Sequence, residues 1–515
     1  MKTATPACPL LYTFLQGLLR ALLSLPAIFA LSIPLFLTAC GGSAGSTPGA
    51  AKPWTWMSGS NTVGANGGQP GVYGTLGSPA VGNVPGGRAG SVSWRDGSGN
   101  LWLFGGYGFD STGAQGYLND LWVFNPTSKE WTWMSGSSTL GANGGQSGVY
   151  GTLGTPAASN VPGGRGGSVS WIDGSGNLWL FGGFDSIAGA QGNLNDLWVF
   201  NPTSKEWTWM SGSSTLGSHG GQPGVYGMLG TPAASNVPVG RGESVGWMDG
   251  SGNLWLFGGY GQDSTGTPGY LNDLWVFNPT SKEWTWMSGS STLGSHGGQP
   301  SVYGMLGSPA ASNVPGGRYG SVSWTDGSGN LWLFGGFGPD STGAGGLLAQ
   351  GLLNDLWVFN PTSKEWTWMS GSSTLGANGG QSGVYGTLGT AAASNVPGGR
   401  GGSVSWIDGS GNLWLFGGSG VDSTGAQGYL NDLWVFNPTS KEWTWMSGSN
   451  TLGANSGQSG VYGTLGTPAA SNVPGGRSGS VGWMDGSGNL WLFGGYGPDS
   501  TTAQGDLNDL WRYQP

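Results

Sequence analysis

Six arginine residues recur at matching points of the sequence, and their chemistry suits ligand binding. They are Arg88, Arg165, Arg241, Arg318, Arg400 and Arg477. A guanidinium group can hold a carboxylate or another anion through two parallel hydrogen bonds. Six aspartates recur as regularly, at Asp120, Asp196, Asp273, Asp355, Asp432 and Asp509. The arginines could therefore form either a ring that binds an acidic ligand or structural ion pairs with these aspartates, and the sequence leaves both interpretations open.

Six tyrosines form a second repeated set, each within Gly-Val-Tyr-Gly or a close variant. They are Tyr73, Tyr150, Tyr226, Tyr303, Tyr385 and Tyr462. Exposed aromatic rings stack on sugars and anchor partner proteins, which makes these tyrosines candidate binding residues. The segments that contain them are long loops, however, and a small core of Val, Tyr and the following Leu would order such a loop. We favour packing for the tyrosines, with ligand contact as the alternative.

The residue types that usually build catalytic or metal sites are scarce. The chain has only two histidines, His219 and His296, and two cysteines, Cys8 and Cys40. Both histidines stand in loops where the other copies have asparagine, and no lone pair of carboxylates stands out from the sixfold background, so we expect no catalytic residues, no metal and no cofactor. The repeated Asp-Gly-Ser-Gly-Asn segments resemble calcium loops only weakly, because they lack the later bidentate carboxylate. A tight turn explains these segments better.

The first 39 residues differ from the rest of the chain and end in a short motif. An apolar run of about 17 residues, 21–37, is followed by Thr38-Ala39-Cys40. This arrangement resembles the lipobox of bacterial lipoprotein signal peptides, which implies removal of residues 1–39 and lipidation of Cys40. A transmembrane anchor is the alternative, but the run is at the lower length limit for spanning and contains two prolines. Residues 40–51 would then be the lipidated cysteine and a flexible Gly/Ala/Ser-rich tether.

Charge narrows the range of partners. Without residues 1–39, the chain has 14 basic and 25 acidic residues, a formal charge of −11. This balance disfavours nucleic acid and anionic lipid as direct partners, so we expect contact with a membrane through the lipid anchor only. We also expect an exported monomer, lipid-anchored to the outer membrane or the cell surface.

The rest of the chain consists of six near-identical copies. Trp-Thr-Trp-Met-Ser-Gly begins at 54, 131, 207, 284, 366 and 443, and Leu-Trp-Leu-Phe-Gly-Gly also occurs six times. In the second copy, apolar runs between turn signals predict four antiparallel strands, at 166–171, 177–182, 196–201 and 206–211. The second strand is apolar on both faces, so neighbouring copies must cover it on both sides. The predicted fold is all-β, with the copies stacked as blades of a propeller.

The two ends of the repeated region are complementary. The first copy starts with an outermost strand, Trp54–Met57, whereas the last copy ends at Tyr513, just after its third strand. Pairing between these two segments would complete a sixth blade and leave no open sheet edge.

The copies resemble kelch repeats. The resemblance rests on the glycine pair after the second strand, Gly105-Gly106, and on an aromatic residue separated by six residues from a tryptophan, Phe124 and Trp131. It covers nearly all of residues 52–515, although Phe124 stands where the family usually has Tyr and the units are about 77 residues long, against about 50 in the family. Six copies of four strands each predict a six-bladed propeller, and the resemblance implies that a partner binds on its long-loop face. Some kelch-like propellers are copper oxidases, but this chain lacks the histidines and the cysteine of that site.

These observations lead to one leading function and two alternatives. The connection 183–195 and the interblade segment from about Met210 to Arg241 should lie on one face of the ring, and loops on a rigid scaffold commonly bind ligands. We therefore predict a non-catalytic, surface-displayed binding or adhesion module for a protein or glycan ligand that could be multivalent. The alternatives are a structural scaffold component of the cell envelope and, with less support, an enzyme of unknown type.

Overall fold

The computed structural model describes residues 53–187, 190–217, 220–294, 297–342 and 350–515. The chain divides into two units, residues 1–48 and 49–515. The predicted signal peptide, Cys40, the tether, His219 and His296 all lie outside the described residues. The described part is built of β-strands and loops. Among these residues, no helix is long and apolar enough to cross a membrane.

The second copy shows the strand arrangement that the others repeat. Its centre is a hairpin of β11 (Leu178–Ile187) and β12 (Ala190–Asn201). On the inner side, β9 (Arg165–Gly166) and β10 (Val169–Ile172) both pair with β11, and on the outer side β13 (Glu206–Ser211) pairs with β12. All four predicted strands are therefore present. The two central strands are longer than predicted, because pairing resumes beyond a β-bulge between Phe181 and Gly183; most of the predicted loop 183–195 is strand.

The remaining copies use the same antiparallel order. The innermost strands are β2 (Arg88–Ala89), β3 (Val92–Arg95), β14 (Arg241–Gly242), β15 (Val245–Met248), β19 (Val322–Thr325), β23 (Arg400–Gly401), β24 (Val404–Ile407) and β28 (Val481–Met484). The central strands are β4 (Leu101–Phe104), β5 (Tyr107–Phe109), β6 (Gln115–Tyr117), β7 (Leu121–Asn125), β16 (Leu254–Gln262), β17 (Pro268–Asn278), β20 (Leu331–Pro339), β21 (Gln350–Asn360), β25 (Leu413–Val421), β26 (Gln427–Asn437), β29 (Leu490–Pro498) and β30 (Gln504–Tyr513). The outermost strands are β1 (Trp54–Ser58), β8 (Glu130–Ser135), β18 (Glu283–Ser288), β22 (Glu365–Ser370) and β27 (Glu442–Ser447).

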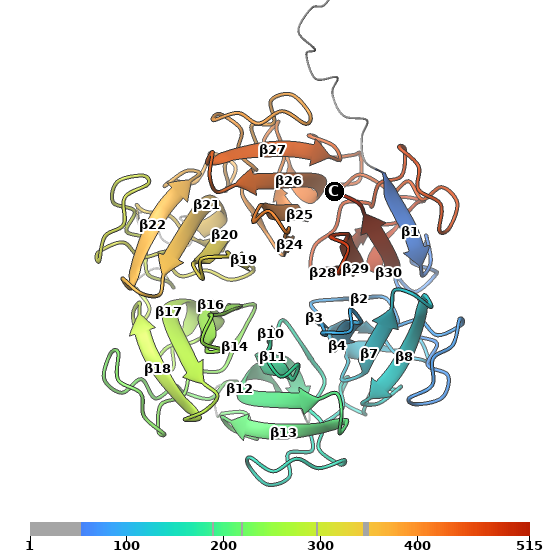
Figure 1. Cartoon of the computed structure of the whole chain (residues 1–515), viewed down its shortest axis with the longest axis horizontal. Coiled ribbons are helices and arrows are strands. Elements are labelled where there is room, and N and C mark those ends of the chain that lie inside the picture. The colour runs from blue at the N-terminus through green and yellow to red at the C-terminus, as the bar shows by residue number, and fades with distance from the viewer. Residues whose placement is uncertain (1–52, 188–189, 218–219, 295–296, 343–349) are drawn as a thin grey trace, which may run out of the picture. The chain divides into compact units, whose positions relative to one another are not determined.

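These strands form seven antiparallel sheets, an arrangement consistent with a β-propeller. The first copy contributes two of the seven, β3-β4-β7-β8 and β2-β5-β6, because its central strands are interrupted near the Gly105-Gly106 pair. Figure 1 shows the sheets of residues 53–515 around a common centre, with β3, β10, β19, β24 and β28 innermost. The first and last strands also pair, with Trp54 opposite Tyr513.

The apolar core lies between neighbouring sheets, as the two-faced strands require. In β11, Leu178 and Leu180 pack with Trp94 and Trp102 of the first copy, whereas Trp179 and Phe181 pack with Leu254 and Leu256 of the third. These four side chains of β11 are each at most 4% exposed. Alternation along one strand thus joins each copy to both of its neighbours.

Hydrogen bonds between copies run round the centre in two series. The innermost tryptophan of each copy donates its Nε1–H to a tryptophan carbonyl of the next copy, from Trp94 to Trp179 and onward to the bond from Trp483 to Trp102. A second series joins backbone groups at six equivalent positions, with N–O distances of 2.6–2.9 Å, at Gly90, Gly167, Glu243, Gly320, Gly402 and Gly479. In both series the sixth bond returns to the first copy.

The long interblade segments cover the free edge of each outermost strand. In the loop of the first copy, the Gly77 N–H donates to the Trp133 carbonyl at 2.7 Å, and Asn83 Nδ2 donates to the Trp131 carbonyl at 3.0 Å. The loop of the sixth copy treats β1 in the same way, with a hydrogen bond from Gly466 N–H to the Trp56 carbonyl. Figure 1 shows these loops outside the outer strands. They are therefore largely a cover for sheet edges, which would otherwise expose unpaired backbone groups.

Candidate functional site

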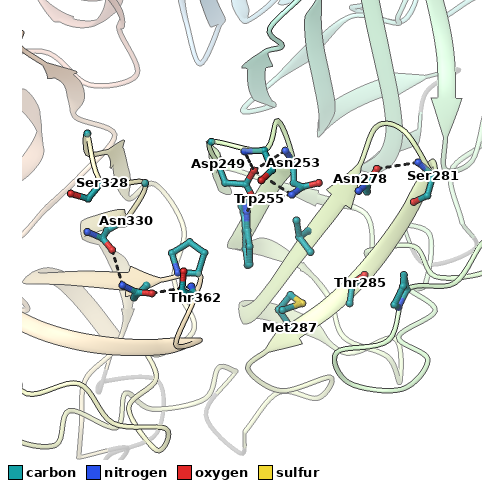
Figure 2. Close-up of a pocket in the computed structure, with 18 residues that line it drawn as sticks. Asp249, Asn253, Trp255, Asn278, Ser281, Thr285, Met287, Ser328, Asn330 and Thr362 are labelled. Atoms are coloured by element: carbon teal, nitrogen blue, oxygen red, sulfur yellow. Dashed lines mark hydrogen bonds between the residues drawn. The ribbon is translucent and has the colours of Figure 1, made fainter.

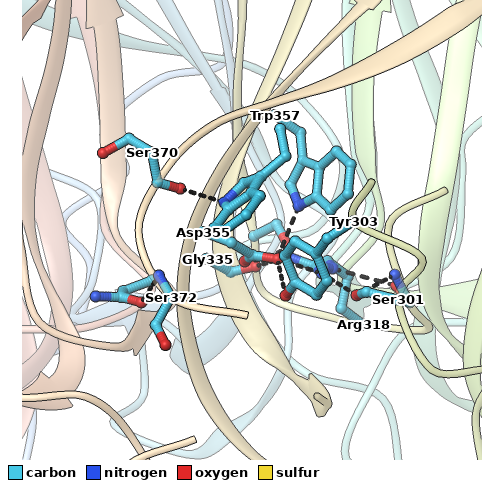
Figure 3. A network of polar contacts seen from close by, with 12 residues as sticks. Ser301, Tyr303, Arg318, Gly335, Asp355, Trp357, Ser370 and Ser372 are labelled. Atoms are coloured by element: carbon cyan, nitrogen blue, oxygen red, sulfur yellow. Dashed lines mark hydrogen bonds and ion pairs between the residues drawn. The ribbon is translucent and has the colours of Figure 1, made fainter. Parts of the chain in front are cut away.

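The repeated arginines lie in a buried polar network, which Figure 3 shows for the fourth copy. Arg318 holds Asp355 through two hydrogen bonds of 2.7 and 2.9 Å. Its Nε and Nη1 groups also donate to the carbonyls of Gly316 and Gly335, both at 3.1 Å. Its Nη2 group also donates to Ser301 Oγ at 3.1 Å, in the one copy that has serine where the others have glycine. Asp355 Oδ2 also accepts hydrogen bonds from the Tyr303 hydroxyl and Trp357 Nε1, both at 2.7 Å. The network joins the interblade loop, the innermost segment and the third strand of one copy.

The same network occurs in all six copies, and it corrects the interpretation of the arginines as a binding ring. The side chains of each Arg–Asp pair are 0% exposed, and their shortest N–O distances are 2.6–2.7 Å. Burial by itself disfavours the charged guanidinium, but the adjacent carboxylate more than offsets this and raises the pKa of Arg318. A ligand cannot reach these groups. The arginines therefore form structural ion pairs with the aspartates, which was the second interpretation that the sequence left open.

The repeated tyrosines belong to the same network. Five of them are 4–7% exposed, and Tyr150 is half-buried. Burial, together with the charge of Asp273, raises the pKa of the Tyr226 phenol, which therefore remains a hydrogen-bond donor. The expected apolar loop core is absent, however, because Val225 and Leu229 are 47% and 54% exposed. Tyr226 packs instead on Trp275 of the blade, so the tyrosine anchors the loop and is not available as a ligand contact.

A groove of about 680 Å³ lies between the turns of the third and fourth copies (Figure 2). Its polar groups are largely paired with one another. Asp249 accepts hydrogen bonds from Asn253 and Trp255, and Asn360 donates to Asn330 at 3.1 Å. The Asp-Gly-Ser-Gly-Asn turn is the same in all six copies, and the Asn-Pro-Thr-Ser-Lys-Glu turn that contains Asn360 is the same in five. The groove is thus explained by turn formation, which confirms the turn interpretation of Asp-Gly-Ser-Gly-Asn.

A second cavity, of about 640 Å³, lies at the centre and receives residues from all six copies. It is next to the backbone ring of Gly90 and its equivalents, at the end of the innermost strands from which the interblade loops enter. Its wall contains large aromatic side chains, among them Tyr107 and Tyr496, which are 42% and 37% exposed. Its other lining residues are mainly Gly and Ser. This axial cavity therefore combines exposed aromatic rings with a concave shape.

The copies differ from one another at the positions that line the axial cavity, although they are otherwise nearly identical. The residue after the network arginine is Ala89, Gly166, Gly242, Tyr319, Gly401 or Ser478. The residue after the glycine pair is Tyr107, Phe184, Tyr260, Phe337, Ser419 or Tyr496. The residue before Leu-Asn-Asp is Tyr117, Asn193, Tyr270, Leu352, Tyr429 or Asp506. Most of these eighteen residues line the cavity, so its wall is asymmetric in a framework that is nearly sixfold.

Among the described residues that line the cavity, Glu243 is the only charged one. It has a φ of +54°, at the position where the other five copies have glycine with φ between +66° and +69°. The side chain is accessible to water, yet protein surrounds it, and this desolvation raises the pKa of its carboxyl. Recurrence does not single out Glu243 or the axial tyrosines, because the copies carry different residues at these positions. The signal lay in the positions where the copies disagree.

Comparisons with known proteins add no identity to this geometry: no protein-family model matches the chain, and no curated protein matches it either. Within the described ranges, no group of three or more His, Cys, Asp or Glu side chains is placed to hold a metal ion.

Proposed function

We propose that residues 53–515 form a closed six-bladed propeller of the kelch type, with β1 as the outer strand of the sixth blade. Three observations support this assignment. Trp54 pairs with Tyr513, two series of hydrogen bonds return to the first copy, and the loop of the sixth copy donates a hydrogen bond to the Trp56 carbonyl of β1. The kelch-like residues also have structural roles that fit. Phe124 packs on Trp131 with ring centroids 5.1 Å apart, and the glycine pair allows close approach of the next blade.

We propose further that the propeller is a non-catalytic binding module, and that its ligand is a protein segment or a glycan held at the axial cavity. The observation that carries this proposal is the divergence of the copies in the cavity wall. A residue that only packs the blades is the same in every copy, as Trp357 and its equivalents are, whereas a wall that recognises one asymmetric ligand needs different residues on different sides. Aromatic rings that are partly exposed in a concave site suit such recognition.

The site replaces the arginine ring as the proposed point of contact. It is single in each chain, so multivalent binding would come from several chains displayed on one surface. We propose that such display follows from lipidation of Cys40 after export, which would place the module on the outer membrane or cell surface. Mass spectrometry of the mature N-terminus tests this point, and an unmodified chain beginning elsewhere would contradict it.

The copies themselves supply matched variants to test the axial site. Tyr107→Ser, Tyr319→Gly and Tyr496→Ser introduce residues that other copies carry at the same positions, so the folded state should tolerate them. Met228→Thr with Met305→Thr makes the same kind of exchange on the peripheral loops, where both methionines are more than 70% exposed. All variants are compared with the unchanged protein on a glycan array and on envelope protein extracts.

We expect the axial variant to lose its best ligand while its unfolding curve stays unchanged, and the loop variant to keep that ligand. Retention of every ligand by the axial variant would contradict the proposal, and loss in the loop variant alone would assign binding to the periphery.

A further inference from the structure

We propose that the axial cavity selects an organic cation, a quaternary ammonium or alkylammonium group, through Glu243 and the surrounding aromatic rings. This inference rests on the proposed axial binding site and adds the chemical class of its ligand. It depends on three features of the third and fourth copies: the position of Glu243, the state of its carboxylate and the rings beside it.

The backbone places the Glu243 side chain inside the cavity. Its N–H donates to the Gly167 carbonyl and its own carbonyl accepts from the Gly320 N–H, so it occupies one of the six positions of the axial backbone ring. A Cβ atom added to Gly320 would lie 3.3 Å from Glu243 Oε2, and one added to Gly167 would lie 3.1 Å from its Cγ. The Glu243 side chain therefore lies against the neighbouring ring glycines, Gly167 and Gly320, where a larger residue would crowd it.

The carboxylate has no cationic partner among the described residues. No ion pair joins it to an arginine or lysine, since Arg165, Arg241 and Arg318 each form an ion pair with the aspartate of their own copy. No hydrogen bond shifts the pKa of the Glu243 carboxyl either; desolvation is the only cause of its rise. A carboxylate that is partly desolvated in a concave site and has no counterion attracts a positive charge.

Aromatic rings lie close to this charge. Tyr319 and Tyr117 line the same cavity as Glu243. Burial, and after it the negative charge of Glu243, raises the pKa of Tyr319 to about 12. Tyr319 is fixed by neighbouring rings: its centroid is 5.6 Å from Tyr270 in a stacked arrangement and 5.7 Å from Phe337. The face of an electron-rich ring attracts a cation, above all a weakly hydrated alkylammonium. A carboxylate beside several such rings matches that class of ligand better than an anion or a neutral apolar group.

The strained backbone also favours a function for Glu243. A residue other than glycine is disfavoured in the left-handed region, and such residues persist where the surroundings or a function require them. Five of the six copies have glycine at this position, so the fold does not require glutamate there.

The test uses isothermal titration of the full-length protein in non-ionic detergent at fixed ionic strength. The probes are choline and its uncharged isostere 3,3-dimethylbutan-1-ol. The variants are Glu243→Gln, which keeps the shape of the side chain, Glu243→Gly, which restores the residue of the other copies, and Tyr319→Gly. We expect saturable binding of choline and an affinity for the isostere that is at least about tenfold lower. In each variant, the affinity for choline should fall by at least about tenfold.

The outcomes separate this inference from the proposed function. Absence of saturable choline binding at millimolar concentration, equal binding of the isostere, or choline binding that Glu243→Gln leaves unchanged would each overturn the cation assignment. If the cation assignment fails while a glycan or protein ligand still depends on Tyr319, the axial binding site stands without it. If no ligand of any class depends on the axial residues, the proposed function fails as well. Should Glu243→Gln fold poorly, Glu243→Gly decides the result.

Discussion

Removal of one buried arginine should cost the propeller a large part of its stability. In Arg318→Met, Asp355 loses two charge-assisted hydrogen bonds and remains fully buried. The Gly316 carbonyl loses its donor, and the Gly335 carbonyl keeps only the hydrogen bond from Ser321 Oγ. Breaking a buried ion pair by deleting one partner typically costs about 3–5 kcal/mol, because an uncompensated charge is left inside. We expect a loss of that size in the free energy of unfolding, measured by urea denaturation followed through tryptophan fluorescence.

A second variant tests whether the pair acts as part of the larger network. In Arg318→Met with Asp355→Leu, no buried charge remains, but the Tyr303 hydroxyl and Trp357 Nε1 both lose their acceptor. Each buried donor left without a partner costs about 1–3 kcal/mol. The double variant should therefore be no more stable than the single one, unlike an isolated ion pair, whose apolar replacement is often neutral. A loss below about 1 kcal/mol in Arg318→Met would refute this reasoning, and a loss of ligand binding at unchanged stability would restore the arginines as binding residues.

Three further predictions concern stability. Glu243→Gly should raise the free energy of unfolding by about 1 kcal/mol, because glycine relieves the left-handed backbone, and a decrease in urea denaturation would contradict this. Burial raises the pKa of Asp506 to about 6, above its value in the unfolded chain. The ionised carboxylate therefore destabilises the folded state above about pH 6, and this destabilisation disappears below about pH 4, where the carboxyl is protonated in both states. Asp506→Asn should accordingly add on the order of 2–3 kcal/mol at pH 7.5 and little at pH 4, whereas an equal gain at both values would exclude this cause. Deletion of residues 52–57 should lower the melting temperature strongly, because it exposes the edge of β30, while deletion of 41–51 should leave it unchanged; equal melting temperatures would argue against closure by β1.

The sequence predicts the blade well because its pattern is local. Alternation in Leu178–Phe181 puts apolar groups on both faces, and that alone requires a cover on each side. The extension of β11 to Ile187 could not be read in the same way, since Gly182-Gly183 looks like the end of a strand. In the structure, these glycines adopt φ values of +63° and +103°, and the bulge carries the pairing onward.

The candidate site was harder to predict for a physical reason. Recurrence identifies what six blades share, which is packing, and so it led to Arg318, Tyr303 and their equivalents, all of which stabilise the fold. The role of the long loops as edge covers depends on backbone groups of Trp131 and Trp133, which have no signature in side-chain patterns. The axial residues are variable between copies, and only the arrangement of the copies round a centre brings Tyr107, Glu243 and Tyr319 to one cavity.

The most direct test of the axial site is a crystal structure of the protein soaked with tetramethylarsonium, because the anomalous scattering of arsenic locates the ion without assumptions. We expect one arsenic site in each chain, inside the axial cavity beside Glu243 and in contact with the ring of Tyr319. An arsenic site only on the outer surface, or the same axial site in crystals of Glu243→Gln, would contradict it.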